Sequence, residues 1–176
     1  MSQLTPSVSK KDHSQGNSHA PLTLVEYGDY QCPHCGHAYP IIKQVQQELG
    51  EQLRFVYRNF PLSEAHPDAF KAAVAAEAAV LQHKFWEMHD IIFENQNALS
   101  WNDLFSYARN IGLNMEHFEE DVQKESIAEK VESDFESGVR SGVNGTPSFF
   151  INGEKYDGSW EEYDLLEYLK SYLQYH

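Results

Sequence analysis

The sequence predicts an α/β fold in which a small mixed sheet is flanked by helices on both faces. A β-rich run near the start of the chain leads into an amphipathic helical pattern. About eighty residues with helical periodicity follow, and two strand-like runs and a last helical stripe end the chain. A length of 176 residues suits one domain, or one domain that carries an insertion.

The composition is typical of a folded globular protein, with 41% hydrophobic and 23% charged residues. The 27 acidic residues outnumber the 13 basic ones and leave a net charge of −14. This balance repels phosphate backbones and anionic lipid surfaces, so we expect no nucleic-acid partner and no membrane insertion. Nine carboxylates fall within residues 111–136 and predict a solvated helical face.

The first half of the predicted sheet consists of two strands on either side of a helix. Residues 22–27 and 53–58 are β-rich runs. Between them, amphipathic helical spacing is kept by Ile41, Ile42, Val45 and Leu49. We expect Gly50 to end this helix and Pro33 to lie in its first turn, where no N–H is required. Pro40 lies inside the helix and predicts a kink.

The middle of the chain predicts five helices. Residues 67–81 are rich in alanine, and residues 85–92 repeat apolar side chains every three or four positions. Ser100 and Asn114 are suitable N-caps for a third and a fourth helix, and residues 127–140 predict a longer fifth. We expect the apolar and aromatic residues of these helices to pack in the core.

The end of the chain predicts a hairpin and a final helix. Residues 148–151 and 154–157 are the two strands, and Asn152-Gly153 is the turn between them. Ser159 and Glu162 have the spacing of a capping box, which predicts that the last helix begins there.

The only two cysteines, Cys32 and Cys35, form a C-x-x-C pair. Two cysteines placed at random would have this spacing in roughly 1% of such chains, so the pattern carries weight. No cysteine is left for a structural disulfide, and Gly36 stands where a c-type haem site needs histidine. The scattered histidines lack the paired spacing of a structural zinc site, so we expect no metal and favour thiol redox chemistry.

The position of the pair at the start of a helix supports this interpretation. Unpaired N–H groups and the helix dipole stabilise a thiolate there. We therefore expect Cys32 to be the nucleophile, and Cys35, one turn further on, to be the shielded resolving thiol. Two inert thiols packed at a helix start are the alternative.

Two segments resemble the thioredoxin superfamily, and in particular its DsbA-like branch. The run Cys32-Pro33-His34-Cys35 follows strand 22–27, and its central dipeptide is the one typical of DsbA proteins. Residues 142–153 resemble the Thr-cis-Pro segment of the superfamily. The resemblance implies a cis bond between Thr146 and Pro147 and a Thr146 backbone that pairs with an extended substrate. An ordinary turn before a strand is the alternative.

The resemblance also implies a division of the chain. A thioredoxin-like domain would consist of residues 21–62 and 142–176, and residues 63–141 would be an inserted helical subdomain. Residues 1–20 are polar, so we expect a flexible tail that adds nothing to the core.

Further roles follow from the resemblance for His34 and Glu26. The His34 ring would stabilise the Cys32 thiolate, and with it the reduced protein, by a hydrogen bond or a positive charge. Glu26, six residues before Cys32, would lie buried beneath Cys35 and move a proton for it. An exposed turn histidine and a strand-end carboxylate are the alternatives, and Asp29 is expected to be solvated.

These features predict a protein thiol-disulfide oxidoreductase that uses no bound cofactor. We expect protein or peptide thiols and disulfides as substrates, and a redox partner protein or glutathione to restore the site. Pro33-His34 favours a disulfide donor. A cytosolic reductase or isomerase, and a binding module with a non-catalytic C-x-x-C, are the alternatives.

The first twenty residues lack the apolar region and the cleavage site of a secretory signal, which predicts a cytoplasmic protein. If the N-terminus has been trimmed, the resemblance favours the bacterial periplasm or cell envelope.

Overall fold

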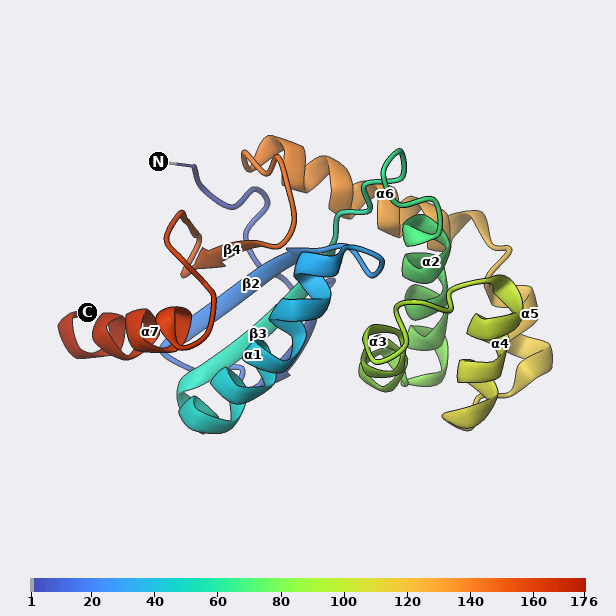
Figure 1. The fold of residues 1–176 in the computed structure, drawn as a ribbon, viewed down its shortest axis with the longest axis horizontal. Helices are drawn as coiled ribbons and strands as arrows, with labels where there is room; N and C mark the ends of the chain where they lie inside the picture. Colours follow the sequence, from blue (N-terminus) through green and yellow to red (C-terminus); the bar gives the residue numbers. More distant parts are fainter. Residues whose placement is uncertain (1) are drawn as a thin grey trace.

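The fold is that of a five-stranded mixed sheet with helices on both faces, in a computed structural model that describes residues 2–176 (Figure 1). The strand order is β1-β3-β2-β4-β5, and only β2 and β3 pair in parallel. The strands are β1 (His13–Gly16), β2 (Leu22–Gly28), β3 (Leu53–Asn59), β4 (Ser148–Ile151) and β5 (Glu154–Tyr156). The predicted fold class is confirmed.

Seven α-helices accompany the sheet in the part of the chain described. In Figure 1, α1 and α7 lie beside the sheet, α2 to α5 form a helical lobe at the right, and α6 runs from this lobe back to the sheet. Their bounds are α1 (Pro33–Leu49), α2 (Ala69–Ala79), α3 (Phe85–Phe93), α4 (Trp101–Asn110), α5 (Met115–Asp121), α6 (Glu125–Arg140) and α7 (Asp164–Tyr175). The inserted helical subdomain therefore joins β3 to β4.

The central strand β2 contributes to two apolar cores because its side chains alternate between the faces of the sheet. Leu22 and Leu24 pack with α1 and the helical lobe, whereas Val25 and Tyr27 pack on the opposite face. Within the lobe, nine of the eleven residues of α2 are buried, and most are alanines, which permits close packing against α3 and α6. Packing on both faces thus fixes the position of β2, and with it the position of the turn that leads from β2 into α1.

Several local predictions agree with the structure. Ser100 forms a capping box with Asp103, and Asn114 caps α5 through its side chain. The hairpin turn has positive φ angles at Asn152 and Gly153, 48° and 89°, as its sequence predicts.

The predicted start of the last helix is wrong. The helix α7 begins at Asp164, and Ser159 does not cap it. Glu162 has a φ of 51°, which a right-handed helix does not allow, so the capping-box pattern of Ser159 and Glu162 has no helix to cap.

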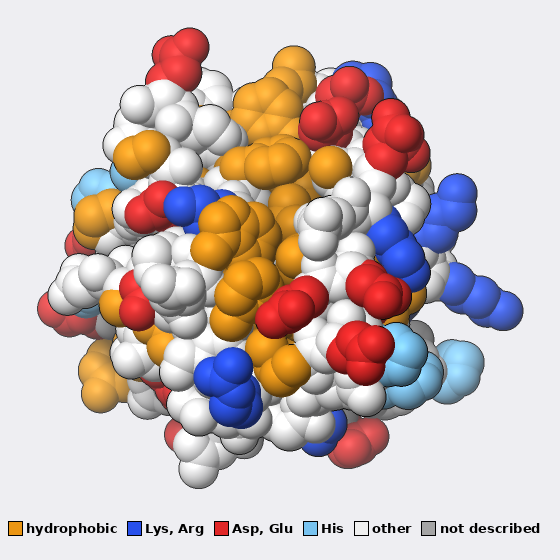
Figure 2. Space-filling view, turned by 90° about the vertical axis from the view of Figure 1, so that its right-hand side faces the viewer, with side chains coloured by type: hydrophobic (Ala, Val, Ile, Leu, Met, Phe, Trp, Pro, Cys, Tyr) orange, Lys and Arg blue, Asp and Glu red, His pale blue; other side chains and the backbone are white. Residues whose placement is uncertain are grey.

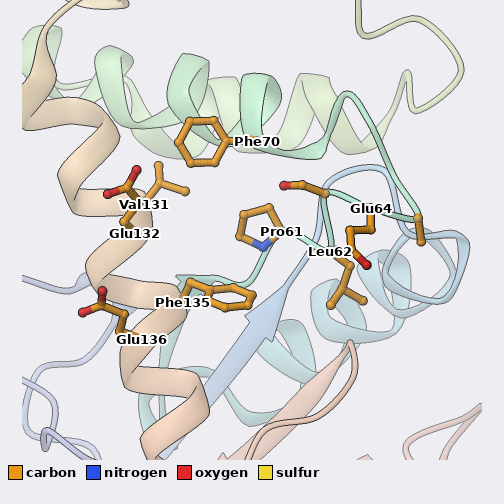
Figure 3. A pocket seen from close by; sticks show the side chains of 10 residues that line it. Pro61, Leu62, Glu64, Phe70, Val131, Glu132, Phe135 and Glu136 are labelled. Atoms are coloured by element: carbon orange, nitrogen blue, oxygen red, sulfur yellow. The ribbon is translucent and has the colours of Figure 1, made fainter.

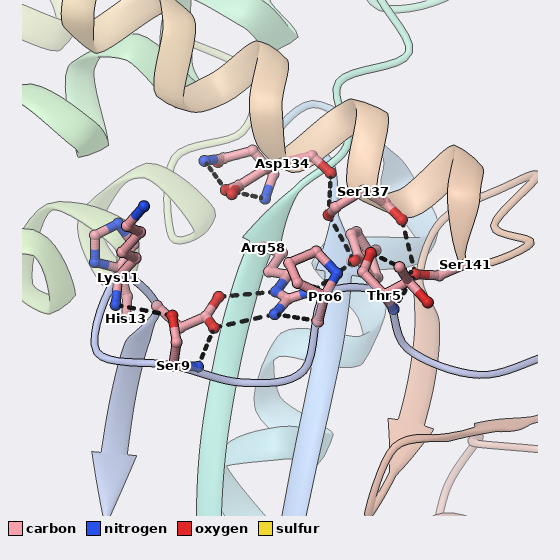
Figure 4. Close-up of polar contacts among 12 residues, drawn as sticks. Thr5, Pro6, Ser9, Lys11, His13, Arg58, Asp134, Ser137 and Ser141 are labelled. Atoms are coloured by element: carbon pink, nitrogen blue, oxygen red, sulfur yellow. Dashed lines mark hydrogen bonds and ion pairs between the residues drawn. The ribbon is translucent and has the colours of Figure 1, made fainter.

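The expectation of a flexible tail that adds nothing to the core is also wrong. Residues 13–16 pair with β3 as an antiparallel edge strand, and Leu4 is buried in the second core. Figure 4 shows how Arg58 of β3 reaches this segment. Its Nε donates to Asp12 at 2.8 Å and its Nη2 to the Pro6 carbonyl at 3.0 Å.

The acidic stretch 111–136 is not uniformly solvated. Asp121 and Asp134 are buried. One carboxylate oxygen of Asp134 accepts from the backbone N–H and the side-chain amide of Asn59, at 3.0 and 2.9 Å. Its other oxygen pairs with Lys130 at 2.5 Å. This carboxylate thus ties α6 to the end of β3.

None of the helices within residues 2–176 is both long enough and apolar enough to cross a bilayer.

Candidate active site at the start of helix α1

The turn between β2 and α1 places Cys32 at the N-cap of the helix. Cys32 has extended backbone angles (φ −68°, ψ 124°), and Pro33 follows at a position that needs no N–H. The free N–H groups of the first turn are therefore directed toward the Cys32 side chain. This is the position that the sequence predicts for the reactive thiol.

The surroundings of Cys32 favour its thiolate. A hydrogen bond from the Cys35 thiol, the side chain of Thr146 and the backbone N–H groups of Cys35 and His34 together lower the pKa of Cys32 to about 5. Burial acts in the opposite direction and is outweighed. Cys32 is therefore ionised at neutral pH.

Cys35 has the opposite character. Its side chain is completely buried, and desolvation raises the pKa of Cys35 well above that of an ordinary thiol, with Cys32 and Glu26 adding to the rise. The backbone N–H of Asp29 donates to Cys35 Sγ at 3.4 Å. Both cysteines are free, so the structure is that of the reduced protein. One sulfur is thus ionised and the other is a protonated thiol.

Glu26 lies on β2 with only 4% of its surface exposed. Burial, together with the nearby Cys32, raises the pKa of Glu26 to about 8, so its carboxyl group holds a proton at neutral pH. Glu26 and Cys35 line the same small hollow of about 10 Å³, which is near the lower limit for one water molecule. A protonated carboxyl group and the buried Cys35 thiol therefore share this hollow.

The loop before β4 lies against the reactive sulfur. The bond between Thr146 and Pro147 is cis, as the resemblance implies. Cys32 Sγ lies 3.7 Å from the Thr146 carbonyl oxygen. The C-x-x-C pair and the Thr-Pro segment, over a hundred residues apart in the sequence, thus form one site.

Of the two roles expected for the His34 ring, a hydrogen bond or a positive charge, the structure shows no hydrogen bond among the described residues. His34 and Pro33 are exposed at the first turn of α1. The backbone N–H of His34 helps to lower the pKa of Cys32. Among the described residues the His34 ring accepts and donates no hydrogen bond, so any effect of the ring would have to come from its charge.

Asp29 was expected to be solvated, and this is wrong: it is 1% exposed. Its Oδ1 accepts from the backbone N–H groups of Gln31 and Cys32 at 2.8 and 3.1 Å. Its Oδ2 accepts from the backbone N–H of Leu62 at 2.9 Å and from His66 Nδ1 at 2.8 Å. Four donors thus satisfy the buried carboxylate, which joins the active-site turn to the loop after β3.

The helical lobe holds the same turn at two further points. Gln31 Oε1 accepts from the backbone N–H of Asp68, just before α2, at 2.8 Å. Gln96 Nε2 donates to the carbonyl oxygens of Tyr30 and Cys32, both at 2.9 Å. A Cβ atom at Gly36 would lie only 1.9 Å from Gln96 Oε1, so a larger residue here would displace the Gln96 amide from its present position. These contacts could not be predicted from the sequence, because Gln96 and Asp68 are each more than thirty residues away from the turn.

The thiolate predicts a pH profile for alkylation of the reduced protein by iodoacetamide. The rate should reach half its maximum near pH 5, the pKa of Cys32. Cys35→Ala should move the midpoint upward, because it removes the hydrogen bond that lowers this pKa most, whereas Cys35→Ser keeps a donor and should move it less. A wild-type midpoint near 8.5, the pKa of an ordinary thiol, would contradict this assignment.

Within residues 2–176 no three His, Cys, Asp or Glu side chains are grouped so that they could hold an ion.

Solved structures with the same fold include several redox proteins. The chain is similar to a thioredoxin-like oxidoreductase from Silicibacter pomeroyi, with a TM-score of 0.83, 24% identity and coverage of 96% of this chain and 95% of that one. It is also similar to oxidised BdbD from Bacillus subtilis, with a TM-score of 0.83, 26% identity and coverage of 99% and 98%. The thiol-disulfide exchange protein alpha-DsbA2 from Wolbachia pipientis has a TM-score of 0.81, 20% identity and coverage of 94% and 87%.

Similar curated sequences are much longer than this chain. Na(+)/H(+) antiporter NhaA 1 of Mycolicibacterium vanbaalenii is 42% identical over 170 residues, which are 96% of this chain and 28% of that protein. Na(+)/H(+) antiporter NhaA 1 of Salinispora arenicola is 40% identical over 157 residues, 89% of this chain and 24% of that protein. The chain therefore spans about a quarter of the curated relatives it matches.

The sequence model of the thioredoxin family matches residues 8–171, nearly the whole chain. Both strands that flank α1, the C-x-x-C pair and the Thr-Pro segment lie inside the match. The chain therefore belongs to the thioredoxin family, and its fold is that of the DsbA-like thiol-disulfide oxidoreductases.

Proposed function

We propose that this protein is a thiol-disulfide oxidoreductase that donates a Cys32–Cys35 disulfide to protein or peptide thiols. The observation that carries the proposal is the contrast between an ionised Cys32 and a buried, protonated Cys35. An ionised Cys32 stabilises the reduced protein, and a couple whose reduced form is stabilised is more oxidising.

The proposed reaction has two exchange steps. A substrate thiolate attacks Cys32 Sγ of the oxidised protein, and Cys35 leaves and takes up a proton, for which Glu26 is the nearby donor. A second substrate thiolate then attacks the substrate sulfur of the mixed disulfide and releases Cys32 as a thiolate. The substrate loses two electrons and two protons, and the pair gains the two electrons. One proton ends on Cys35 by way of Glu26, which takes up a substrate proton in return, and the other substrate proton is released to solvent.

The loop of Thr146 and Pro147 provides a place for the substrate backbone. The Thr146 carbonyl lies beside Cys32 Sγ, so a chain bonded to this sulfur would pass along the loop. Contacts with the backbone would accept many sequences. A redox partner protein or glutathione would reoxidise the pair.

Two alternative functions predict measurements different from those expected of a disulfide donor. In a compartment kept reducing, the same pair would act as a reductase or an isomerase. A binding module with a non-catalytic C-x-x-C would reach no redox equilibrium with glutathione.

Na(+)/H(+) antiport, the activity in the names of the curated relatives, belongs to proteins of which this chain spans about a quarter.

The redox equilibrium with glutathione tests the proposal. Protein incubated in buffers of different glutathione ratios would be quenched with acid, and its free thiols counted. We expect a potential less negative than about −200 mV, in the range of oxidising relatives of thioredoxin. A value near −270 mV, typical of thioredoxin, would contradict disulfide donation but not exchange. Failure to equilibrate would contradict both.

A further inference from the structure

A groove of about 640 Å³ lies between the loop after β3, helix α2 and helix α6. Its apolar lining consists of Pro61, Leu62, Ala65, Phe70, Val131 and Phe135. Figure 3 shows Phe70, Phe135 and Pro61 directed toward the middle of the groove from the three elements. Phe135 also stacks on Phe60 of the second core, with 4.3 Å between ring centroids. The apolar floor of the groove is therefore continuous with the second hydrophobic core.

Carboxylates form the rim of this groove. Glu64, Glu132 and Glu136 line it and are exposed. Among residues 2–176 they form no ion pair, and the groove lining contains no Lys or Arg. Glu132 and Glu136 are one helical turn apart on α6, where like charges repel each other. A cation bound between them would relieve this repulsion.

The groove is linked to the reactive cysteine through one side chain. Leu62, on the groove wall, donates its backbone N–H to Asp29 Oδ2 at 2.9 Å. The other oxygen of the same carboxylate accepts from the backbone N–H of Cys32 at 3.1 Å. The loop that lines the groove and the turn that carries Cys32 are thus held together by a single buried group.

The wider surface of the helical lobe has a similar character. Figure 2 shows the side of the molecule that lies at the right in Figure 1, where hydrophobic side chains form a band with carboxylates along its edges. A second hollow of about 470 Å³ is lined by Trp101 and Phe105 of α4 and by Val122, just after α5. Of these two hollows, only the groove between α2 and α6 is lined by a residue, Leu62, that hydrogen-bonds with the active-site turn.

We propose that this groove binds the substrate polypeptide through a segment in which apolar side chains are flanked by Lys or Arg. The inference rests on the proposed function and adds a substrate preference to it. The apolar floor accepts side chains that a reduced, unfolded chain exposes, and the three carboxylates select positive charge. A second copy of this chain is a poorer occupant, because its net charge of −14 would meet an acidic rim.

The test compares two peptides that share a cysteine pair and apolar residues, one flanked by lysines and the other by glutamates. Each is oxidised by the wild-type disulfide form, and each rate is divided by the rate with glutathione. At low salt the lysine peptide should react roughly tenfold faster, and about 0.5 M NaCl should remove most of the difference. Replacing Glu64, Glu132 and Glu136 by Gln should reduce the ratio to about twofold.

A matched variant separates the groove from net charge. Replacing Glu48, Glu161 and Glu167 by Gln removes three exposed carboxylates elsewhere and should keep the roughly tenfold ratio. An equal loss in both triple variants would overturn the proposal, as would equal rates for the two peptides with wild type. A dimer in sedimentation equilibrium that the groove substitutions dissociate would show a self-interface and also overturn it. Failure of wild type to exchange with glutathione would instead refute the proposed function.

Discussion

Replacing Cys32 with serine is expected to leave a protein whose remaining thiol is almost unreactive. Cys35 is fully buried and its pKa is raised, so little thiolate forms at neutral pH and the reagent cannot reach it. In Cys35→Ser, by contrast, Cys32 stays at the helix start beside the N–H groups of the first turn. At pH 7 the Cys35→Ser protein should react with a small aromatic disulfide at least about a hundredfold faster than Cys32→Ser.

The two variants should also differ in their products with a peptide disulfide. Cys35→Ser should accumulate a mixed disulfide, because the thiol that would release the peptide is absent. Cys32→Ser should accumulate none, and neither variant should oxidise a dithiol peptide. Mass spectrometry of the trapped species identifies the sulfur. Equal reactivity of the two variants, or a peptide bound to Cys35, would refute the assignment of nucleophile and resolving thiol.

The parts of the site that could be predicted are those determined by local sequence. Cys32 and Cys35 are defined by their spacing, and α1 by the apolar repeat that ends at Gly50. The turn at Asn152 and Gly153 uses a residue pair that tolerates the positive φ angles which a two-residue hairpin turn requires. The position of Thr146 beside Cys32 came from the resemblance, because no local pattern joins segments so far apart.

The N-terminal strand could not be predicted because its own residues do not specify it. Residues 13–16 (His-Ser-Gln-Gly) have low β-propensity, and they pair because β3 offers a free edge of backbone groups. Arg58 also binds this N-terminal segment through Asp12, which is 46 positions away in the sequence. The strand therefore forms because β3 is available as its partner, and residues 13–16 alone do not predict it.

The contacts of Asp29, in the active site, could likewise be predicted only in part from the sequence. Its spacing to Gln31 and Cys32 is that of an Asx-turn, a signal that could have identified half of its contacts. The other half comes from Leu62 and His66. An acid that follows a strand is usually solvated, and only the fold brings four donors around this one.

Replacing Glu26 with glutamine is expected to stabilise the reduced protein at neutral and alkaline pH. The folded pKa of Glu26 is about 8 and its ordinary value is 4.5. Between these values the folded state keeps the proton that the unfolded state has lost. Rising pH therefore favours unfolding by about 1.4 kcal/mol per pH unit from this group. At pH 7 the variant should be about 3 kcal/mol more stable, as measured by urea unfolding.

The pH dependence of this difference identifies its cause, because a packing change would act at every pH. Near pH 4 both proteins carry a neutral group at position 26, so their unfolding free energies should agree within about 0.5 kcal/mol. The difference should grow as pH rises and level off above about 8, where the folded carboxyl also ionises. Glu48→Gln, an exposed carboxylate on α1, should follow wild type throughout. If the Glu26→Gln and wild-type curves instead run parallel from pH 4 to 8, Glu26 is ionised in the folded protein and cannot supply the proton that Cys35 needs.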